Sequence, residues 1–443
     1  MSRKPPPFRP RTVELDILTI GARGDGLAKF DGEQVFVPLT LPGDRVVARL
    51  EGRRADGFTA SMTELVAPGP SRREAPCPLF GQCGGCNLQH VTDQALAEWK
   101  RERLVTAMTR VGFDSRLVAP LVSIPPGTRR RAAFAFTRLA KGVVIGFNER
   151  ASRHIVEVDP CLILMPPLLA LLAPLRALLS GILPTGATGD AVATLTDSGV
   201  DLLIQAEHPL DLFARETLAS FAEAQDLARL SWQKGDFIEP VAHRRPAQVT
   251  MGEVPVDIPP GGFLQPSREG EAALVSLVKE HLPAQGAVLD LYAGSGSFTF
   301  PMAKGRAVTA VEGDAGSFGA LGAAARRAGL SVTANSPLRG STGPSTGAVA
   351  STGTASTGAV SDMAALTSVM LLAISVRGLF FLRSSISLRN SSSSAWRAIS
   401  SKLLRNSLAM ARALPAHLPA ICIRRGRSLG PTTTSATASR MTM

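Results

Sequence analysis

The stretch GAVLDLYAGSGSFTFPMA, residues 286–303, decides the fold of the part of the chain that contains it. An apolar run leads into a glycine-rich turn, and the turn leads into residues that can begin a helix. A second strand is expected over 306–314 (RAVTAVEGD) and a helix over 316–330 (GSFGALGAAARRAGL). This alternation predicts the start of a parallel, doubly wound sheet, of which two strands are recognisable.

The glycine-rich turn is typical of a cofactor site. Asp290 closes the first strand, Gly294 and Gly296 follow it, and Glu312 ends the second strand. A dinucleotide site needs a third glycine where Thr299 stands, because the pyrophosphate approaches the backbone there. S-adenosylmethionine has no phosphate. Its sulfonium suits a nearby acid and its ribose hydroxyls suit Glu312, so we favour this methyl donor over NAD.

A second motif is a group of cysteines in CPLFGQCGGCNLQH, residues 77–90, which contains Cys77, Cys83 and Cys86. No secretory signal follows the basic N-terminus, so metal or redox chemistry is expected rather than disulfides. The spacing C-x5-C-x2-C lacks the second C-x2-C of a zinc ribbon, and Cys161 is the better of the two candidates for a fourth ligand. An iron–sulfur cluster, a zinc ion and unreactive thiols all stay open, in that order of preference.

The rest of the chain indicates a multidomain α+β and α/β protein. Residues 12–66 alternate as short strands with a hairpin at Asp31-Gly32, which predicts a small OB-like barrel of a type that often binds single-stranded nucleic acid. A helix over 93–110, a β-meander over 127–161 and a hairpin over 192–207 follow. The triplet Arg129–Arg131 opens the meander, and we expect it to contact phosphates or to lie on the surface.

Charge separates the last quarter from the body. The net charge is +12, but residues 1–335 hold 36 Lys and Arg against 35 Asp and Glu, whereas residues 336–443 hold 12 against Asp362 alone. Any RNA affinity of the body must therefore come from local patches. Residues 336–443 repeat Ser-Thr-Gly and predict poorly specified structure or disorder. The expected domains are 1–68 (barrel), 69–255 (central), 256–335 (start of the doubly wound domain) and 336–443 (tail).

No stretch predicts a membrane span. The apolar run 161–184 is interrupted by Pro166, Pro167, Pro174 and Arg176, and the run 363–382 is interrupted by Arg377. One or two buried helices are expected over 161–184. We expect a cytoplasmic monomer.

Taken together, these motifs resemble the bacterial RNA uracil-5-methyltransferases, in particular the 23S rRNA type, over residues 10–335. Besides the motifs above, GGFLQPS (261–267) carries the resemblance. The resemblance implies an N-terminal TRAM barrel, a Rossmann-like methyltransferase domain, RNA as partner and S-adenosylmethionine as cofactor. It also implies a [4Fe-4S] cluster on Cys77, Cys83, Cys86 and Cys161. The methyl-donor contacts that it implies are Gln265, Tyr292 and Glu312, with Ser297 on the same loop.

The family's reaction uses a cysteine thiolate that adds to uracil C6 and a carboxylate that removes the C5 proton from a flipped-out base. The family's nucleophile loop and C-terminal glutamate are not recognisable after residue 314, where the only cysteine is Cys422, without the Asn-Pro that follows the family's nucleophile. We therefore assign no catalytic residue. We hypothesise that a frameshift or a misassigned gene end near residue 336 produced this break. We predict a methyltransferase by descent without turnover, the alternative being a non-catalytic RNA-binding iron–sulfur protein.

Overall fold

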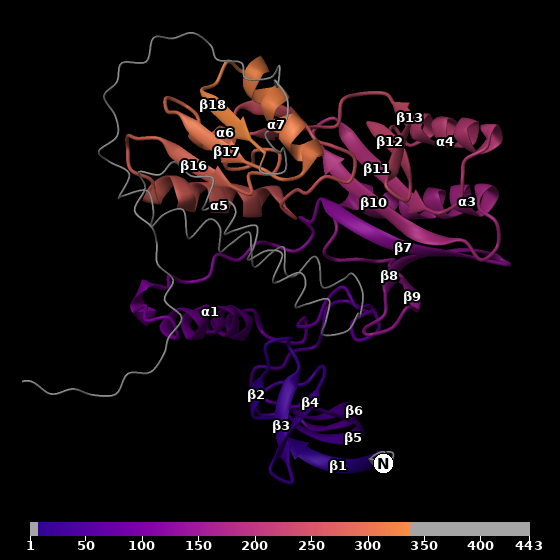
Figure 1. Cartoon of the computed structure of the whole chain (residues 1–443). Helices are drawn as coiled ribbons and strands as arrows, with labels where there is room; N and C mark the ends of the chain where they lie inside the picture. The colour runs from indigo at the N-terminus through magenta and orange to yellow at the C-terminus, as the bar shows by residue number, and fades with distance from the viewer. Residues whose placement is uncertain (1–7, 337–443) are drawn as a thin grey trace, which may run out of the picture. The chain divides into compact units, whose positions relative to one another are not determined.

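The computed structural model describes residues 8–336, and these residues form four β-sheets and seven α-helices (Figure 1). The tail expected over 336–443, including Cys422, lies outside the described residues except for Ser336. No helix among the described residues is long and apolar enough to cross a membrane.

The N-terminal sheet has six strands in the order β1-β5-β6-β4-β3-β2. The strands are β1 (Arg11–Asp16), β2 (Thr19–Ile20), β3 (Gly26–Phe30), β4 (Glu33–Val37), β5 (Arg45–Arg54) and β6 (Gly57–Ala67). Asp31 and Gly32 join β3 to β4 with φ of 51° and 79°, which confirms the predicted hairpin and is typical of a type I′ turn. Alternate residues such as Val35, Val37 and Val46 are buried and form the core of this sheet.

The cysteine loop leads into helix α1 (Asp93–Thr109), as predicted. A seven-stranded sheet follows in the order β13-β12-β11-β10-β7-β8-β9. Its strands are β7 (Arg131–Leu139), β8 (Gly142–Asn148), β9 (Ile155–Glu157), β10 (Thr188–Thr196), β11 (Gly199–Ala206), β12 (Arg229–Lys234) and β13 (Phe237–His243). The hairpin predicted over 192–207 is formed by β10 and β11.

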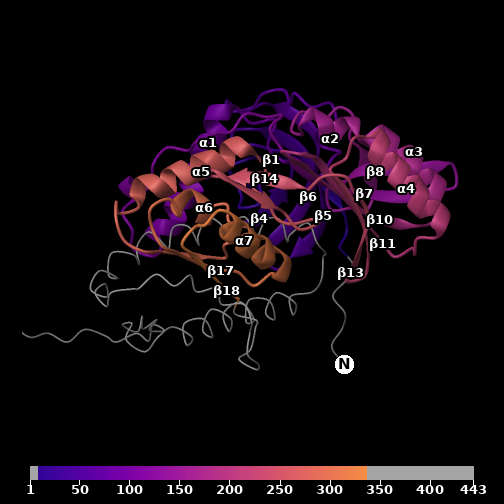
Figure 2. The same ribbon diagram turned by 90° about the horizontal axis from the view of Figure 1, so that it is seen from above.

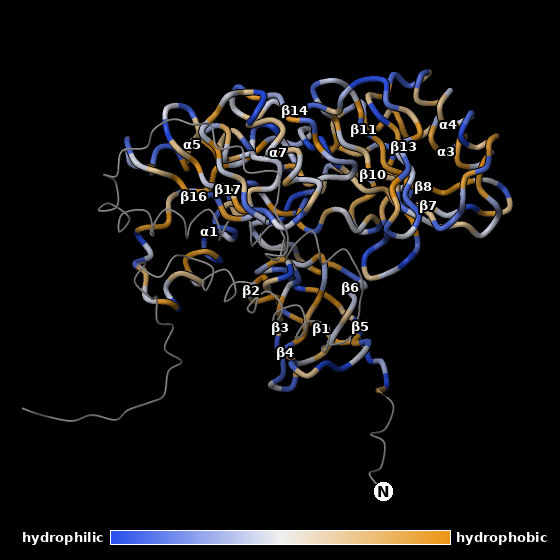
Figure 3. The backbone as a smooth tube through the Cα atoms, turned by 45° about the horizontal axis from the view of Figure 1, so that its top comes forward, coloured by the Kyte–Doolittle hydropathy of each residue, from blue (hydrophilic) through white to orange (hydrophobic). Residues whose placement is uncertain are grey.

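Three helices belong to this second sheet: α2 (Pro166–Ala170), α3 (Leu172–Ile182) and α4 (Leu212–Ala224). The apolar run 161–184 thus forms two helices that contribute buried leucines to the core, as expected. Helices α3 and α4 lie side by side on the sheet (Figures 1 and 2). The central strands β10 and β11 are buried along most of their length, and Figure 3 shows hydrophobic stretches of the tube near them.

The third part begins with the hairpin of β14 (Gln248–Met251) and β15 (Val254–Asp257), which spans the boundary expected at residue 255. Helix α5 (Arg268–His281) precedes the parallel series β16 (Val288–Leu291), α6 (Thr299–Met302), β17 (Val308–Val311), α7 (Ala315–Arg327) and β18 (Val332–Asn335). The three strands pair in parallel in the order β16-β17-β18. The parallel β–α alternation that the sequence predicted is thus confirmed, but the prediction of only two strands was wrong. Strand β18 was missed because its four residues are all partly or fully exposed and carry little apolar signal.

Candidate active site

The glycine-rich turn joins β16 to α6, and it lies where the carboxyl ends of parallel strands place ligand sites in open α/β sheets. The backbone N–H of Gly294 donates to Glu312 Oε2 at 2.6 Å, and the N–H of Asp314 donates to Glu312 Oε1 at 2.7 Å. Glu312 therefore ties the turn to the end of β17. A carboxylate accepts about four hydrogen bonds, so each oxygen keeps room for a further donor.

Backbone conformation explains the residue types of the turn. Tyr292, Gly294 and Gly296 all have positive φ, at 58°, 58° and 109°. A Cβ on Gly296 would lie 2.4 Å from Cε2 of Phe300, so only glycine fits there. Ser295 is 3% exposed, and its Oγ has no hydrogen-bond partner among the described residues. This buried hydroxyl is a polar group that a ligand in the turn can satisfy.

The residue that replaces the third glycine of a dinucleotide motif has a structural task. Thr299 is fully buried, and its Oγ1 donates to Asp290 Oδ2 at 2.6 Å. Glycine at this position would leave a carboxylate that is 6% exposed without this hydrogen bond. The pair Asp290–Thr299 thus fixes the start of α6 below the turn.

A buried ion pair connects the turn with a distant strand. Arg130 is 1% exposed and precedes β7. Its Nη2 donates to Glu271 Oε2 at 2.8 Å, and its Nε donates to the backbone oxygen of Gln265 at 3.1 Å. Glu271 Oε2 also lies 3.5 Å from Ser297 Oγ in the turn. Burial lowers the pKa of Arg130 and the nearby Glu271 opposes this, but an arginine stays charged at neutral pH.

This network corrects the expectation for Arg129–Arg131. Arg130 faces the interior, and Arg131 donates from Nη2 to the backbone oxygen of Gly261 at 3.1 Å. Only Arg129 is exposed. Arg130 is therefore not on the surface, and Arg130 and Arg131 both hold the segment that precedes α5.

The structure brings the expected donor contacts together in pairs. Gly294 binds Glu312 directly, and Gln265 and Ser297 meet through Arg130 and Glu271. Tyr292 is 37% exposed at the end of β16, while Gln265 is 2% and Ser297 5% exposed. The sequence analysis missed Arg130 and Glu271. The alternation along β7 held a signal for Arg130, because Ala132, Phe134 and Phe136 are buried on the same face.

The four cysteines form a second cluster of chemically active groups. Cys77, Cys83, Cys86 and Cys161 are all free thiols. Burial raises the pKa of Cys83 and of Cys86, and in both cases Cys161 and Cys77 add to the rise, so the structure places these thiols in one neighbourhood. The N–H of Gly85 donates to Cys83 Sγ at 3.4 Å. Across residues 8–336, no three Cys, His, Asp or Glu side chains are grouped as a metal ion would require.

Comparison with known proteins decides the family. The chain is 39% identical over 312 residues to an uncharacterized RNA methyltransferase of Brucella suis. This alignment covers 70% of this chain and 72% of that protein. It is 33% identical over 313 residues to the 23S rRNA (uracil(1939)-C(5))-methyltransferase RlmD of Alkalilimnicola ehrlichii, covering 68% of this chain and 70% of that one. The chain belongs to the RNA uracil-5-methyltransferase family. The resemblance inferred from the motifs is thereby confirmed.

Solved structures agree with this family at the level of the fold. The tRNA (uracil-54, C5)-methyltransferase of Pyrococcus abyssi, solved with S-adenosyl-L-homocysteine, matches with a TM-score of 0.56 and 20% identity. The match covers 74% of this chain and 80% of that protein. No protein-family model matches the sequence.

Proposed function

We propose that this chain, a uridine C5 methyltransferase by descent, binds S-adenosylmethionine in the turn after β16 and binds 23S rRNA as the family's substrate. The observation that carries the proposal is the bond between Gly294 and Glu312 in a chain of this family. It holds an acid beside a glycine-rich turn at the carboxyl end of a parallel sheet. S-adenosylmethionine supplies an electrophilic methyl group when bound.

The residues at the turn fit this donor. Glu312 keeps acceptor capacity for two ribose hydroxyls, and Ser295 Oγ offers a buried hydroxyl without a partner among the described residues. Asp290, Gly296 and Ser297 shape the turn, while Tyr292 and Gln265 flank it. The resemblance assigns Gln265, Tyr292 and Glu312 to donor contact, and the proposal keeps these roles.

We assign RNA binding to the six-stranded sheet, as a TRAM barrel. Three arginine side chains lie over aromatic rings on it: Arg11 over Phe30, Arg53 over Phe58 and Arg54 over Phe36. The Arg53 and Arg11 side chains are 60% and 51% exposed. Arg11 and Arg53 also form exposed ion pairs with Asp31 and Glu33, which are weak enough for an RNA phosphate to replace the carboxylate. Exposed cations beside the half-buried rings of Phe30 and Phe36 suit the phosphates and bases of single-stranded RNA.

We assign a [4Fe-4S] cluster to Cys77, Cys83, Cys86 and Cys161. A zinc ion holds its sulfur ligands about 3.8 Å apart, given a Zn–S distance of about 2.3 Å. The cysteines influence one another electrostatically without forming a group suited to a single ion among residues 8–336. A cluster in which each of four thiolates binds its own iron needs four cysteines in one neighbourhood, and the electrostatic effects of Cys77 and Cys161 on Cys83 and Cys86 are consistent with that. The Gly85 N–H to Cys83 Sγ is a hydrogen bond of the kind that tunes such clusters.

Catalysis itself is the step that we expect this chain to lack. No nucleophile loop or terminal glutamate of the family is recognisable in 336–443, and Cys422 lies outside the described residues. We therefore expect donor and RNA binding without methyl transfer.

The test incubates anaerobically reconstituted protein with a uridine-containing 23S rRNA fragment and a methyl-labelled donor. Retained RNA without label on it is the expected result, and label on uridine C5 would refute the expected loss of turnover. Calorimetry with S-adenosylhomocysteine tests the donor site independently of turnover. Glu312→Gln is expected to weaken this binding about tenfold, by the roughly 1.5 kcal/mol or more of a hydrogen bond to a charged group. The control Glu280→Gln, on an exposed position of α5, is expected to bind like the parent.

A further inference from the structure

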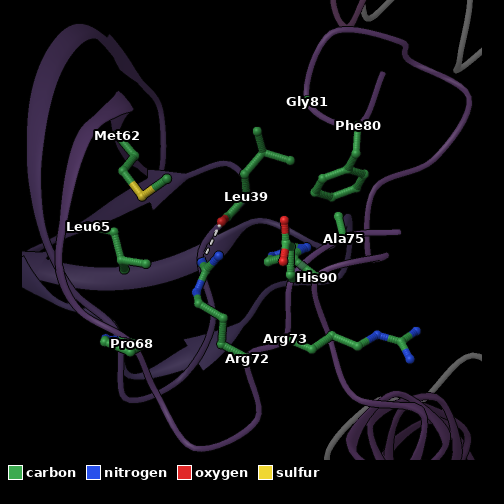
Figure 4. A pocket seen from close by; sticks show the side chains of 11 residues that line it. Leu39, Met62, Leu65, Pro68, Arg72, Arg73, Ala75, Phe80, Gly81 and His90 are labelled. Atoms are coloured by element: carbon green, nitrogen blue, oxygen red, sulfur yellow. Dashed lines mark hydrogen bonds between the residues drawn. The ribbon is translucent and has the colours of Figure 1, made fainter. Parts of the chain in front are cut away.

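A cavity lies between the six-stranded sheet and the cysteine loop (Figure 4). Its volume is about 510 Å³, within the range of roughly 300–1,000 Å³ typical of small-ligand sites. Leu39, Met62 and Leu65 line it from the sheet side, and Phe80 lines it from the cysteine loop, with His90 beside it. The lining is therefore mainly apolar and aromatic.

The walls of this cavity are fixed by a buried ion pair. Asp44 is 1% exposed, and its Oδ2 accepts from Arg72 Nη2 at 2.6 Å. The same Nη2 also donates to the backbone oxygen of Leu39 at 2.8 Å. The N–H of Arg73 donates to the backbone oxygen of His90 at 2.8 Å, which ties the segment after β6 to the end of the cysteine loop. These bonds fix the backbone walls of the cavity before any ligand binds.

His90 is the unusual group in this cavity. It is 2% exposed, yet neither ring nitrogen has a hydrogen-bond partner among the described residues. Burial, with Arg72 nearby, lowers the pKa of His90 to about 4, so the ring is neutral at pH 7. A neutral imidazole offers one donor and one acceptor. The Phe80 ring lies beside it, with centroids 5.1 Å apart and planes tilted by 36°.

We propose that this cavity binds one unstacked nucleobase of the RNA, with Phe80 and the leucines against its faces and His90 hydrogen-bonded to its edge. The inference rests on the proposed RNA-binding function and adds a second, non-reacting base to it. A base presents both a flat apolar face and an edge of mixed donors and acceptors, which is what Phe80 and a neutral His90 complement. An anion suits the cavity less well, because Arg72 is paired with Asp44 and Arg73 with Asp93.

The experiment measures RNA affinity with one base removed at a time. Fluorescence anisotropy gives the Kd of the full chain for a single-stranded 23S rRNA fragment and for a series of it with one abasic nucleotide each. One position is expected to lose about 5- to 150-fold, which corresponds to the roughly 1–3 kcal/mol of a stacked base. Ala75→Trp fills the cavity. It is expected to weaken binding of the unmodified RNA by a similar factor, and removal of that base is then expected to have no further effect on the Kd. Ala219→Trp, the same change at an exposed position of α4, is the matched control.

A second variant tests the edge contact. His90→Phe keeps an aromatic ring but removes both nitrogens, so the loss at the abasic position is expected to persist while discrimination among the four bases at that position disappears. Equal abasic losses in the parent and in Ala75→Trp would overturn the cavity proposal while leaving RNA binding in place. A parent protein that binds no RNA would instead overturn the proposed function, and the cavity proposal with it. Retained base discrimination in His90→Phe would overturn the role of His90.

Discussion

Replacement of Arg130 by methionine is the perturbation that most directly tests how the donor site is held together. Methionine is similar in length and removes the guanidinium, so it leaves the carboxylate of Glu271 buried without this partner. The change also removes the hydrogen bond to the backbone oxygen of Gln265. The turn carrying Ser297 is then expected to lose order, because Glu271 loses the ion pair that helps to fix its position.

The magnitude follows from the burial of the pair. The side chains of Arg130 and Glu271 are 2% and 11% exposed. Removal of one partner from a buried pair costs about 3–5 kcal/mol, because an uncompensated charge stays in the interior. Arg130→Lys keeps a charge but loses the forked geometry, and about 1–3 kcal/mol is expected for it.

Hydrogen exchange is the suitable assay, because it reports the free energy of opening segment by segment in a protein of several parts. In Arg130→Met, the free energy of opening is expected to fall by about 3–5 kcal/mol at the amides of β16, α6 and the start of α5. The amides of β3 and β4 are expected to keep their protection. In the double variant Arg130→Met with Glu271→Gln, the free energy of opening is expected to fall by less than the sum of the two single-variant losses, because the buried carboxylate charge is also removed. A loss below about 1 kcal/mol, or strict additivity, would show that this pair does not hold the site.

Three further changes are expected to act locally. Asp44→Asn should cost about 3–5 kcal/mol in urea unfolding because its side chain is fully buried against an arginine. Burial raises the pKa of Asp44, but its hydrogen bonds outweigh this and lower the pKa below the ordinary value of 3.8. Ionised Asp44 therefore contributes to the free energy of unfolding above pH 3.8, and this contribution is lost as the pH falls below that value. The parent should show this loss of stability in acid, and Asp44→Asn should not. Gly296→Ala should cost about 2 kcal/mol or more and weaken S-adenosylhomocysteine binding, given the contact with Phe300, whereas the helical control Gly319→Ala, which meets nothing within 4 Å, should stabilise by about 0.5–1 kcal/mol. Cys161→Ser should lower iron below the roughly four atoms per chain expected of the parent, and a colourless, iron-free parent would contradict the cluster.

The sequence predicted those parts of the fold in which local pattern and tertiary environment agree. The strand–turn–helix unit at 286–303 was predictable because glycines at positive φ, an apolar strand and a closing acid all have local signatures. Strand β18 was not, because its pairing with β17 supplies the order that its own composition lacks. Glu312 was predicted at the end of its strand, but its hydrogen bond with the Gly294 N–H in the turn was not predicted.

The candidate site was predictable only where it lies on one stretch of sequence. Glycines, Asp290 and Glu312 could be read from their spacing, but the partnership of Arg130 with Glu271 joins residues 141 positions apart. Three consecutive arginines resemble an exposed basic patch, and charge alone outweighed the two-residue alternation that placed Arg130 inward. His90 gave no signal either, because its lack of partners is a property of the folded chain.

The position of Arg130 also limits how the molecule can be divided. An excised fragment that starts at residue 256 would contain Glu271 but not its guanidinium partner, and it would expose the carboxylate or unfold around it. Chimaeras that exchange the methyl-donor half between relatives are therefore expected to succeed only if an arginine is kept at position 130, directly before β7. The methyl-donor part of the protein is thus discontinuous along the gene, because the codon for Arg130 lies far upstream of the codons for the rest of that part.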